Sequence, residues 1–480
     1  AYLGWWAGDA GAVDFSALKT FHVVDELSGK TVLQGQITPR QLQDPLSGEN
    51  VYQMDLSGLA PGTYHVQAPG LGRSATFGVG GDGIRQLYFH TNRAFYHQRC
   101  GQELAEPYTS FTKPACHLEV YESGYLVGNK NYLPKEGEKI RQFRGGYHDA
   151  ADFDTYAHHL SATSQALDVY EFAPDKFKDG DLNIPESGDG IPDVLDEANW
   201  ALFFYRAQQR ADGAVPVGRG NDCDDIRNRE AQHGRRPPFG VFPPTIRSTA
   251  TYAAVAAQYS KLIRKYDSPR AERYLESARR ALSWARANAN TGQDAAEGHR
   301  LLLAWATARL YDATGNEEIH GQFKELCAAG AFKHVHWKWQ SRVPFCSWPY
   351  VACSRPGVDE ELRTKLKADI IRRADAVVKQ TEPAPYRVGC GKKSNGLGDP
   401  SNMNVYRVIL HKDGTLFVLR QDYIIAVDAY NGTILWDLDI PKFHRIGIPH
   451  QTGSACLGER YLYAASGASC WVIDPASGRK

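Results

Sequence analysis

The chain has 480 residues, and its 55 basic side chains balance its 55 acidic ones, so the formal net charge is zero. This balance argues against proteins that bind nucleic acids or anionic membrane surfaces through a basic face, and no apolar run is long enough to span a bilayer. Nine cysteines, an odd number, exclude complete intramolecular pairing. The length allows two or three domains. The first residues, 1–6, lack the basic start and apolar core of a signal peptide.

Residues 1–82 are predicted to form a small β-sandwich. Three short β-rich runs, at 21–24, 51–56 and 63–67, are separated by turn sequences that contain glycine or proline. Such spacing is typical of a small all-β module. The glycine-rich stretch 78–83 is predicted to link this module to the next domain, and we expect the module to support that domain rather than to carry catalysis.

The middle of the chain is predicted to be helical. After a loop-rich stretch from 84 to 155, apolar residues recur at helical spacing. One helix is marked by Pro192 in its first turn, with Asp193, Asp196 and Glu197 near the positive end of the helix dipole. Consecutive helices indicate an α/α architecture. The seven predicted helices span residues 156–172, 192–210, 246–265, 270–288, 297–314, 316–328 and 358–380.

The character of the chain changes again near residue 391. The stretch Gly391–Pro400 is rich in glycine and is predicted to be a linker. Two β-rich runs follow at 415–419 and 423–428. Residues 391–480 are therefore predicted to form a third, all-β part.

A repeated turn sequence lies within this last part. The segment Ala426-Val-Asp-Ala-Tyr-Asn-Gly-Thr-Ile-Leu-Trp436 resembles the repeat of quinoprotein-like (PQQ-type) β-propellers, and a second copy starts at Val472. The offset from Asp428 to Asp474 is 46 residues, a period typical of a propeller blade. One blade leaves open sheet edges and does not close a propeller.

The stretch Arg144-Gly-Gly-Tyr-His-Asp-Ala-Ala-Asp-Phe-Asp-Thr-Tyr156 holds two carboxylates three residues apart, Asp149 and Asp152. Gly145 and Gly146 precede them and allow backbone turns that side chains would forbid. Two close carboxylates repel each other, so at least one pKa is expected to be perturbed, which suits a general base. The alternative is a solvated acidic turn or a helix N-cap.

This stretch resembles the Gly-Gly-x-x-Asp-Ala-Gly-Asp-x-x-x-Tyr motif of glycoside hydrolase family 9, the inverting cellulases. Residues 84–390 follow that family in order, and residues 1–82 resemble the immunoglobulin-like module that often precedes it. Ala151 stands where the family usually has glycine. The resemblance implies an (α/α)6 barrel, here incomplete because twelve helices are needed and seven are predicted. It also implies Asp152 as the general base, with Asp149 holding the water or tuning Asp152.

A zinc site is predicted from two thiols and two imidazoles. Zinc commonly takes four nitrogen and sulfur ligands in structural sites. The spacing here is not that of a zinc finger, but the family resemblance implies a zinc site with this order of ligands. A Cys100–Cys116 disulfide and buried thiols are the alternatives. The four predicted ligands are Cys100, Cys116, His117 and His148.

A calcium site is predicted on the acidic loop that precedes the helix at Pro192. Its hard oxygen ligands on a tight loop suit calcium. The loop is not an EF-hand, because Ile184 replaces the glycine that an EF-hand requires. The resemblance implies calcium at a similar loop, and a solvated acidic loop is the alternative. The predicted ligands are Asp179, Asp181, Asn183 and Asp189.

A run of aromatic residues is predicted to bind substrate by stacking on glucose rings. Lysine, arginine and proline are interleaved with them, which favours a partly exposed loop. Packing between helices is the alternative. The residues are Trp337, Trp339, Trp348 and Tyr350.

An inverting glycosidase also needs an acid opposite the base, with the two carboxyl groups roughly 6.5–9.5 Å apart. In the family this acid is a glutamate near the end of the barrel, and no position of this sequence matches it. Glu360, Glu361 and Glu382 lie in or beside an ordinary amphipathic helix and are not assigned to the role. The incomplete barrel and the single blade predict a truncated fusion or a mis-joined reading frame.

The predicted function is hydrolysis of β-1,4-glucosidic bonds in cellulose or a related β-glucan by inversion. The protein is predicted to be secreted or periplasmic and to hold structural Zn²⁺ and Ca²⁺. Its expected partner is a β-glucan polysaccharide or oligosaccharide, with no nucleic acid and no membrane span. Because the acid is not assigned, the activity of this chain is expected to be impaired. Two alternatives stay open: a non-catalytic carbohydrate-binding or scaffold protein, and a quinoprotein-like propeller fusion.

Overall fold

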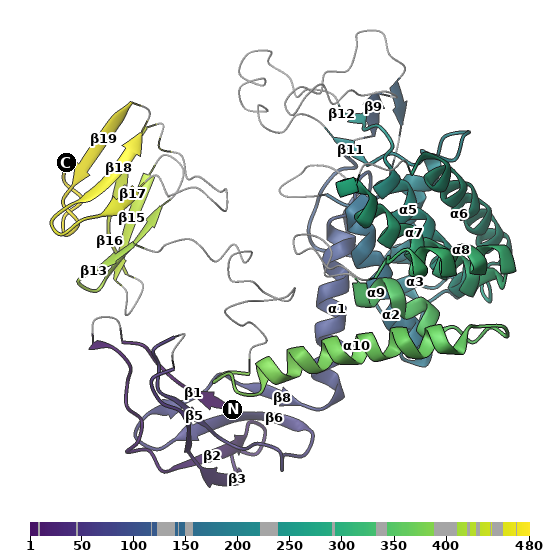
Figure 1. The fold of residues 1–480 in the computed structure, drawn as a ribbon. Coiled ribbons are helices and arrows are strands. Elements are labelled where there is room, and N and C mark those ends of the chain that lie inside the picture. The colour runs from purple at the N-terminus through teal and green to yellow at the C-terminus, as the bar shows by residue number, and fades with distance from the viewer. Residues whose placement is uncertain are drawn as a thin grey trace. The chain divides into compact units, whose positions relative to one another are not determined.

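The computed structural model describes residues 1–7, 10–44, 47–116, 118–121, 140–142, 144–148, 157–220, 239–289, 293–332, 343–387, 410–419, 423–428, 433–441, 443, 455–466 and 468–480. The chain divides into two compact units. One unit contains Ala1–Asp82 and Ala374–Lys480, and the other contains Gly83–Arg373. The first consists mainly of β-sheets and the second mainly of helices (Figure 1). No helix in these ranges is both long and apolar enough to cross a membrane.

Residues 1–82 form two small antiparallel β-sheets around one apolar core. One sheet has the strand order β1-β5-β4, and the other has the order β3-β2-β6-β7, with β8 paired to β6. Phe21 and Val23 alternate with less buried residues along β2 and meet Tyr52, Tyr64 and Val66 in the core. This confirms a two-sheet β-module at the start of the chain. Its strands are β1 (Tyr2–Leu3), β2 (Thr20–Asp25), β3 (Thr31–Gln36), β4 (Thr38–Gln41), β5 (Val51–Gln53), β6 (Gly62–Ala68), β7 (Gly72–Arg73) and β8 (Phe77–Val79).

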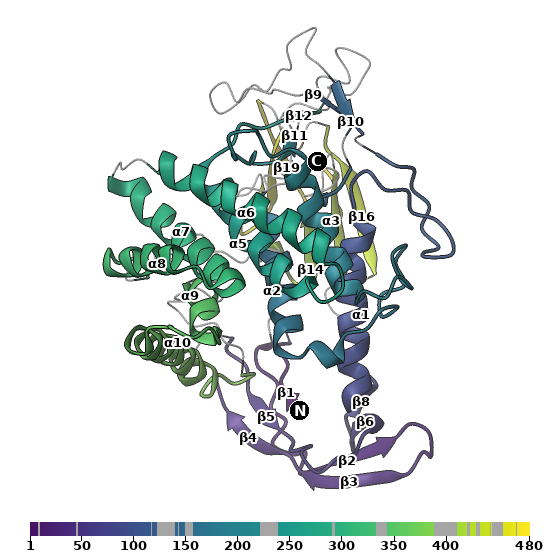
Figure 2. The ribbon, with the colours of Figure 1, turned by 90° about the vertical axis from the view of Figure 1, so that its right-hand side faces the viewer.

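The central helix of the second unit is α5 (Ile246–Ile263), which packs against α2, α3, α6 and α7 (Figure 2). It starts at a capping box, in which the Thr245 hydroxyl accepts a hydrogen bond from the Ser248 amide at 3.0 Å. Alanines on several sides of α5 are fully buried and let the neighbouring helices approach closely. The alanines are Ala250, Ala253, Ala254, Ala256 and Ala257.

Eight further α-helices, two 3₁₀ turns and one small sheet complete the described part of this unit. The sheet has the order β10-β9-β12-β11. The helices are α1 (Gly81–His97), α2 (Leu160–Phe172), α3 (Asp193–Ala207), α6 (Ser268–Asn288), α7 (Gln293–Thr314), α8 (Glu317–Ala328), α9 (Val343–Ala352) and α10 (Glu360–Thr381), and the 3₁₀ turns are Ala157–His159 and Pro174–Lys176. The strands are β9 (Glu119–Tyr121), β10 (Ile140–Gln142), β11 (Arg219–Gly220) and β12 (Phe239–Val241).

The structure contains all seven predicted helices, with ends within a few residues of the predicted bounds. Two helices of the described residues were not predicted. Helix α1 starts inside the stretch 78–83 that was expected to be a linker, and glycines there were taken as helix breakers. Its buried positions include Arg93 and Tyr96 rather than aliphatic residues, so the helical pattern was weak. Helix α9 contains Pro349, and the lysine, arginine and proline interleaved with the aromatic residues favoured a partly exposed loop.

The C-terminal residues form two antiparallel sheets that share a core. The four strands β13 (Leu410–Lys412), β14 (Thr415–Leu419), β15 (Tyr423–Asp428) and β16 (Ile434–Asp439) form a meander, and β17 (Ala455–Leu457), β18 (Leu462–Ser466) and β19 (Ser469–Ile473) form a second one (Figure 1). The turn after β15 has a bond from the Asp428 amide to the Thr433 carbonyl at 2.8 Å, and the turn after β19 repeats it between Asp474 and Arg479 at 2.8 Å. The sequence repeat is thus also a repeat of backbone geometry.

Candidate active site

The segment Arg144–His148 leads directly into the carboxylate pair of the motif, and it has a defined backbone. Gly145 and Gly146 have φ values of 104° and 74°, a region that favours glycine. A Cβ atom on Gly145 would lie 3.1 Å from Cβ of Phe204 and 3.2 Å from the carbonyl oxygen of Trp200. Both turn geometry and crowding therefore require glycine at 145. Asp149 and Asp152 lie outside the described residues.

Backbone hydrogen bonds join this segment to the residues that follow α1. The Gly145 amide donates to the Cys100 carbonyl and the Cys100 amide donates to the Gly146 carbonyl, each at 3.0 Å. The His148 amide donates to the Gln98 carbonyl at 2.8 Å. These bonds bring His148 next to residues that lie almost fifty positions earlier in the chain.

Helix α3 holds the segment from the other side. The indole Nε1 of Trp200 donates to the Gly146 carbonyl at 3.0 Å, and the Tyr147 hydroxyl lies 2.8 Å from Oε1 of Glu197. From the sequence, Glu197 was expected only to interact with the helix dipole, and Tyr147 had no predicted role. The sequence does show a tyrosine inside the motif and a glutamate on a helix face. No local sequence pattern indicates that these two residues contact each other.

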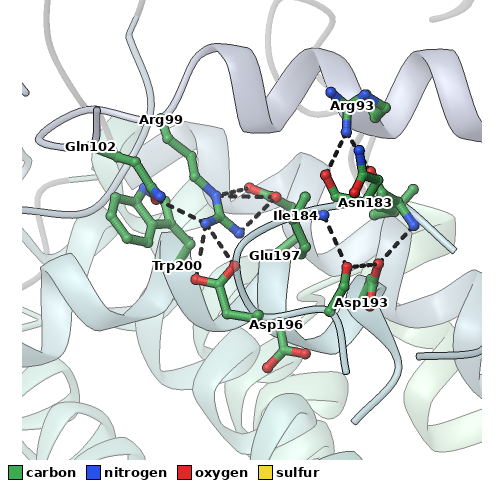
Figure 3. Close-up of polar contacts among 12 residues, drawn as sticks. Arg93, Arg99, Gln102, Asn183, Ile184, Asp193, Asp196, Glu197 and Trp200 are labelled. Atoms are coloured by element: carbon green, nitrogen blue, oxygen red, sulfur yellow. Dashed lines mark hydrogen bonds and ion pairs between the residues drawn. The ribbon is translucent and has the colours of Figure 1, made fainter. Parts of the chain in front are cut away.

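A fully buried arginine organises the charges around this contact (Figure 3). Arg99 forms ion pairs with Glu197 at 3.0 Å and with Glu186 at 2.9 Å, and its guanidinium lies 4.6 Å from the centre of the Trp200 ring. Burial lowers the pKa of Arg99, but the carboxylates of Glu197 and Glu186 more than offset it, so the pKa is raised and the charge is retained. Burial, with a contribution from Glu197, raises the pKa of Tyr147 well above its ordinary value.

The predicted zinc ligands come together in part. Among the described residues, Cys100, Cys116 and His148 form a group whose ligand atoms all lie within 4.8 Å of one another. Nε2 of His148 is 3.2 Å from Sγ of Cys116. Both cysteines carry thiols, so the alternative disulfide is not formed in this structure. His117 lies outside the described residues.

Arg219 on β11 is a further neighbour of the cysteines that the sequence did not indicate. Its Nη2 donates to Sγ of Cys100 at 2.5 Å, and its side chain is buried. The hydrogen bond with Cys116 and burial raise the pKa of the Cys100 thiol, whereas Arg219 lowers it. Cys100 is buried, and Cys116 and His148 are half-buried. Two sulfurs and an imidazole that converge in this way are part of the donor set that a zinc ion takes.

The predicted calcium ligands lie on a loop that is closed by its own hydrogen bonds. The carboxylate of Asp179 accepts from the amides of Gly188 at 2.5 Å and Gly190 at 2.7 Å. The carboxylate of Asp181 accepts from the Lys178 amide at 2.7 Å. Asn183 has a φ of 49°, and its carbonyl accepts from Arg93 at 2.7 Å. Oδ1 of Asp189 accepts from the Ile191 amide at 2.8 Å.

Asp196 on α3 is a carboxyl group that this loop leaves incompletely satisfied. The residue is 3 % exposed, its Oδ2 has no hydrogen-bond partner among the described residues, and Arg270 is 3.6 Å from Oδ1. Burial, followed by the charges of Asp189 and Glu186, raises the pKa of Asp196 to about 8. A buried carboxylate without enough partners is costly, and a cation would offset that cost.

The predicted substrate-binding aromatics fall into different environments. Trp337 and Trp339 lie outside the described residues. The Trp348 ring is half-buried, 5.2 Å from that of Phe172. Tyr350 is fully buried, and its hydroxyl lies 2.7 Å from Nε2 of His320. That environment matches the packing alternative, so we correct the expectation for Tyr350, whose ring has no face open to a sugar.

Comparison with known families agrees with these features. The family model "Glycosyl hydrolase family 9" matches residues 86–384, more than half of the chain. The chain belongs to glycosyl hydrolase family 9. The model "Cellulase N-terminal ig-like domain" matches residues 9–73, which lie in the N-terminal β-module.

Relatives of this family 9 chain support the same placement. Endoglucanase D of Acetivibrio thermocellus is 26% identical over 385 residues, which are 76% of this chain and 59% of the relative. The chain therefore spans less than two thirds of that relative. A metagenome-derived family 9 endoglucanase structure has a TM-score of 0.66 at 26% identity and covers 81% of this chain and 72% of its own. A zinc-binding triple mutant of a family 9 endoglucanase has the same fold, with a TM-score of 0.63, 22% identity and coverage of 82% and 73%.

Proposed function

We propose that this family 9 chain derives from an inverting hydrolase of β-1,4-linked glucans. Asp152 is the general base that removes a proton from the attacking water, and Asp149 holds that water or tunes Asp152. The observation that carries the proposal is the set of hydrogen bonds to Gly145–His148. They hold the backbone just before Asp149 from two sides, the residues after α1 and helix α3. A base must be held within hydrogen-bond reach of its water, and a segment with fixed backbone meets this need.

The proposed reaction still requires a proton for the leaving sugar. Inversion uses an acid on the opposite side of the bond, and the sequence provides no position for the family's glutamate. Among the glutamates set aside above, Glu360 is in the first turn of α10 and forms an ion pair with Arg363 at 3.0 Å. The proposed activity is therefore weak on natural glucans and better on aryl glycosides, whose leaving group depends less on protonation.

We propose a three-part organisation for the chain. Residues 1–82 form the immunoglobulin-like module, 84–390 an incomplete (α/α)6 catalytic domain and 391–480 a propeller-like (PQQ-type) segment. Support for the last part comes from the repeated turn bonds at Asp428 and Asp474. We also propose that the protein acts outside the cytoplasm, in a secreted or periplasmic form, because its substrate is a polymer.

Zinc is proposed to bind Cys100, Cys116, His117 and His148. The convergence of three of these side chains supports it. The ion would supply a structural cross-link between the residues after α1 and the catalytic segment, and this would stabilise the fold rather than take part in the reaction.

Calcium is proposed at the loop with Asp179, Asp181, Asn183 and Asp189. The unsatisfied oxygen of Asp196 and the raised pKa caused in part by Asp189 support a cation beside these two carboxylates. The ion would offset like charges at the start of α3. We add Asp196 to the candidate ligands on this ground.

The substrate class is proposed from the relatives and the aromatic residues together. The relatives include endoglucanases and a xyloglucan-specific endo-β-1,4-glucanase of Bacteroides ovatus, which is 23% identical over 414 residues. Trp337, Trp339 and Trp348 remain the proposed stacking residues. A soluble β-1,4-glucan and an aryl β-cellobioside are the appropriate first substrates, and reducing-sugar or phenolate release measures the reaction.

A second candidate function is carbohydrate binding without hydrolysis. The missing glutamate favours it for this chain. One experiment distinguishes the two functions. A protein that only binds β-glucan migrates more slowly in gels that contain β-glucan, yet it releases no reducing sugar. Hydrolysis that disappears in Asp152→Asn supports the first function, and binding that persists in that variant with no hydrolysis by the parent supports the second.

A further inference from the structure

Tyr147 links the catalytic segment to the interior of α3. Its side chain is 7 % exposed and its ring lies 5.4 Å from that of Phe95. Its hydroxyl is 2.8 Å from Oε1 of Glu197 and 2.9 Å from the Glu197 carbonyl oxygen. The next residue is His148, which contacts Cys116, and Asp149 follows. A single side chain thus connects the backbone before the carboxylate pair to one residue of a buried helix.

Glu197 is itself held in place by a charge. Arg99 donates from Nε and Nη2 to both oxygens of the Glu197 carboxylate at 3.0–3.2 Å. Its Nη1 donates to Glu186 at 2.9 Å. Arg99 also pairs in an isolated antiparallel bridge with Tyr147, so the same residue meets the catalytic segment through its backbone. The Glu197 carboxylate therefore has little freedom to move along the helix.

We propose that Glu197 is a positioning residue for the catalytic segment, and that it acts through the Tyr147 hydroxyl. The ion pair with Arg99 fixes the position of the Glu197 carboxylate, and the carboxylate fixes the position of the Tyr147 hydroxyl. Tyr147 in turn positions His148 and the backbone that leads into Asp149. The part that concerns catalysis rests on the proposed function, whereas the part that concerns His148 and Cys116 does not.

The contact between Tyr147 and Glu197 differs from an ordinary hydrogen bond in the core, because Tyr147 is adjacent in the chain to His148 and the carboxylate pair. Tyr252 on α5 offers the comparison, because it is also buried and its hydroxyl is 2.6 Å from Oγ of Ser277. Tyr252 lies on α5 and its partner Ser277 lies on α6. Loss of either hydroxyl removes one buried hydrogen bond, and only Tyr147→Phe releases a segment that carries functional residues.

The test compares Tyr147→Phe with Tyr252→Phe in the full chain. In chelator-treated protein, iodoacetamide labelling of Cys116, followed by mass spectrometry, measures how often the His148–Cys116 contact opens. We expect labelling to be about 10-fold faster in Tyr147→Phe, because the closed state loses one buried hydrogen bond, and unchanged in Tyr252→Phe. With an aryl β-cellobioside, kcat should fall in Tyr147→Phe while KM is unchanged, because the loss affects orientation rather than binding.

Equal labelling rates in the two variants would overturn the proposal, even if the parent is active. A parent without activity on the aryl substrate would contradict the proposed function, and the labelling result would still decide the positioning role. If Tyr147→Phe does not fold, Glu197→Gln and Glu197→Asp decide instead. Positioning requires that both variants expose Cys116 more than the parent does, because glutamine loses the ion pair with Arg99 and aspartate withdraws the acceptor from the Tyr147 hydroxyl. Labelling no faster than in the parent would overturn it.

Discussion

Gly146 and Trp200 are joined by two reciprocal hydrogen bonds. The Gly146 amide donates to the Trp200 carbonyl at 3.2 Å, and the Trp200 indole donates back to the Gly146 carbonyl at 3.0 Å. The indole ring also lies under the guanidinium of Arg99. One residue of α3 therefore fixes both the catalytic backbone and the arginine that holds Glu197.

The first prediction concerns the indole donor. Trp200→Phe keeps a ring for Arg99 but removes one hydrogen bond, so we expect a loss of about 1 kcal/mol in the free energy of unfolding. Trp305→Phe is the matched control, because the Trp305 indole is buried and its Nε1 has no hydrogen-bond partner among the described residues. That change removes an unsatisfied donor and should cost less. Urea unfolding measures both, and an equal loss would show that ring volume, not the bond, matters.

The second prediction separates crowding from backbone strain at the glycine turn. Gly145 and Gly188 have similar φ values, 104° and 101°, but a Cβ atom would meet Phe204 and Trp200 only at Gly145. Gly188→Ala should cost about 1–2 kcal/mol from backbone strain alone. Gly145→Ala should cost about 1–3 kcal/mol more because of overpacking. Thermal unfolding of the two variants would contradict this account if Gly188→Ala were the more damaging.

The third prediction concerns zinc. Protein purified without added metal should contain about one zinc ion per chain by elemental analysis. Cys116→Ser should lose the metal and unfold at a lower temperature, because the ion ties distant segments together. Cys456→Ser is the control, since Cys456 is exposed on β17. A Cys100–Cys116 disulfide in the purified protein, detected by mass spectrometry, would contradict the zinc site.

The fourth prediction uses the raised pKa of Asp196. Its carboxyl has a pKa of about 8 in the folded protein against an ordinary value of 3.8. As pH rises, the unfolded chain therefore loses this proton at a lower pH than the folded protein does. Stability in chelator should therefore fall as pH rises from about 4 to about 8. Asp196→Asn should flatten this dependence and raise the melting temperature near pH 7.5 by about 2–4 °C for each kcal/mol regained.

Calcium should reverse the effect of that substitution. An ion beside Asp189 and Asp196 stabilises only the parent, by mass action on the folded state, so calcium should raise the melting temperature of the parent and not that of Asp196→Asn. Asp181→Ala tests the loop ligands in the same way. If Asp181→Ala loses the calcium response while Asp196→Asn keeps it, the ion binds the loop without Asp196. If neither loses it, the ion binds elsewhere.

The fifth prediction concerns activity. The proposed reaction has no assigned acid to protonate the leaving sugar, and such acid–base groups typically contribute about 10²–10⁴-fold. We expect slow or undetectable cleavage of soluble β-glucan and relatively faster cleavage of an aryl glycoside. Asp152→Asn should abolish both reactions, while Asp154→Asn, a neighbouring carboxylate without an assigned role, should not. Replacing the residues after 390 with the closing part of a family 9 barrel should increase cleavage. Strong glucan cleavage that persists in Asp152→Asn would locate the site elsewhere.

The sequence predicted the helices and most of the candidate ligands because these depend on local patterns. Apolar spacing marked α5, and the short motif marked the two turn-forming glycines, which have positive φ values as expected. It did not predict α1, whose first turn contains glycines and whose buried face includes Arg93. It assigned Tyr350 to substrate, although neighbouring helices enclose the ring completely.

By itself the sequence determined that this chain carries the family 9 motif, its β-module and a repeated β-segment, since each is a pattern within one short stretch. Tertiary structure alone decided which side chains meet. Arg99 and Glu197 are 98 residues apart, and Tyr147 is 50 residues from Glu197. Burial makes these pairings necessary, because a charge removed from water is costly without a partner of opposite charge. The fold, and not the local sequence, brings that partner close. No local periodicity records such a pairing, so the support of the candidate catalytic segment appeared only in the folded chain.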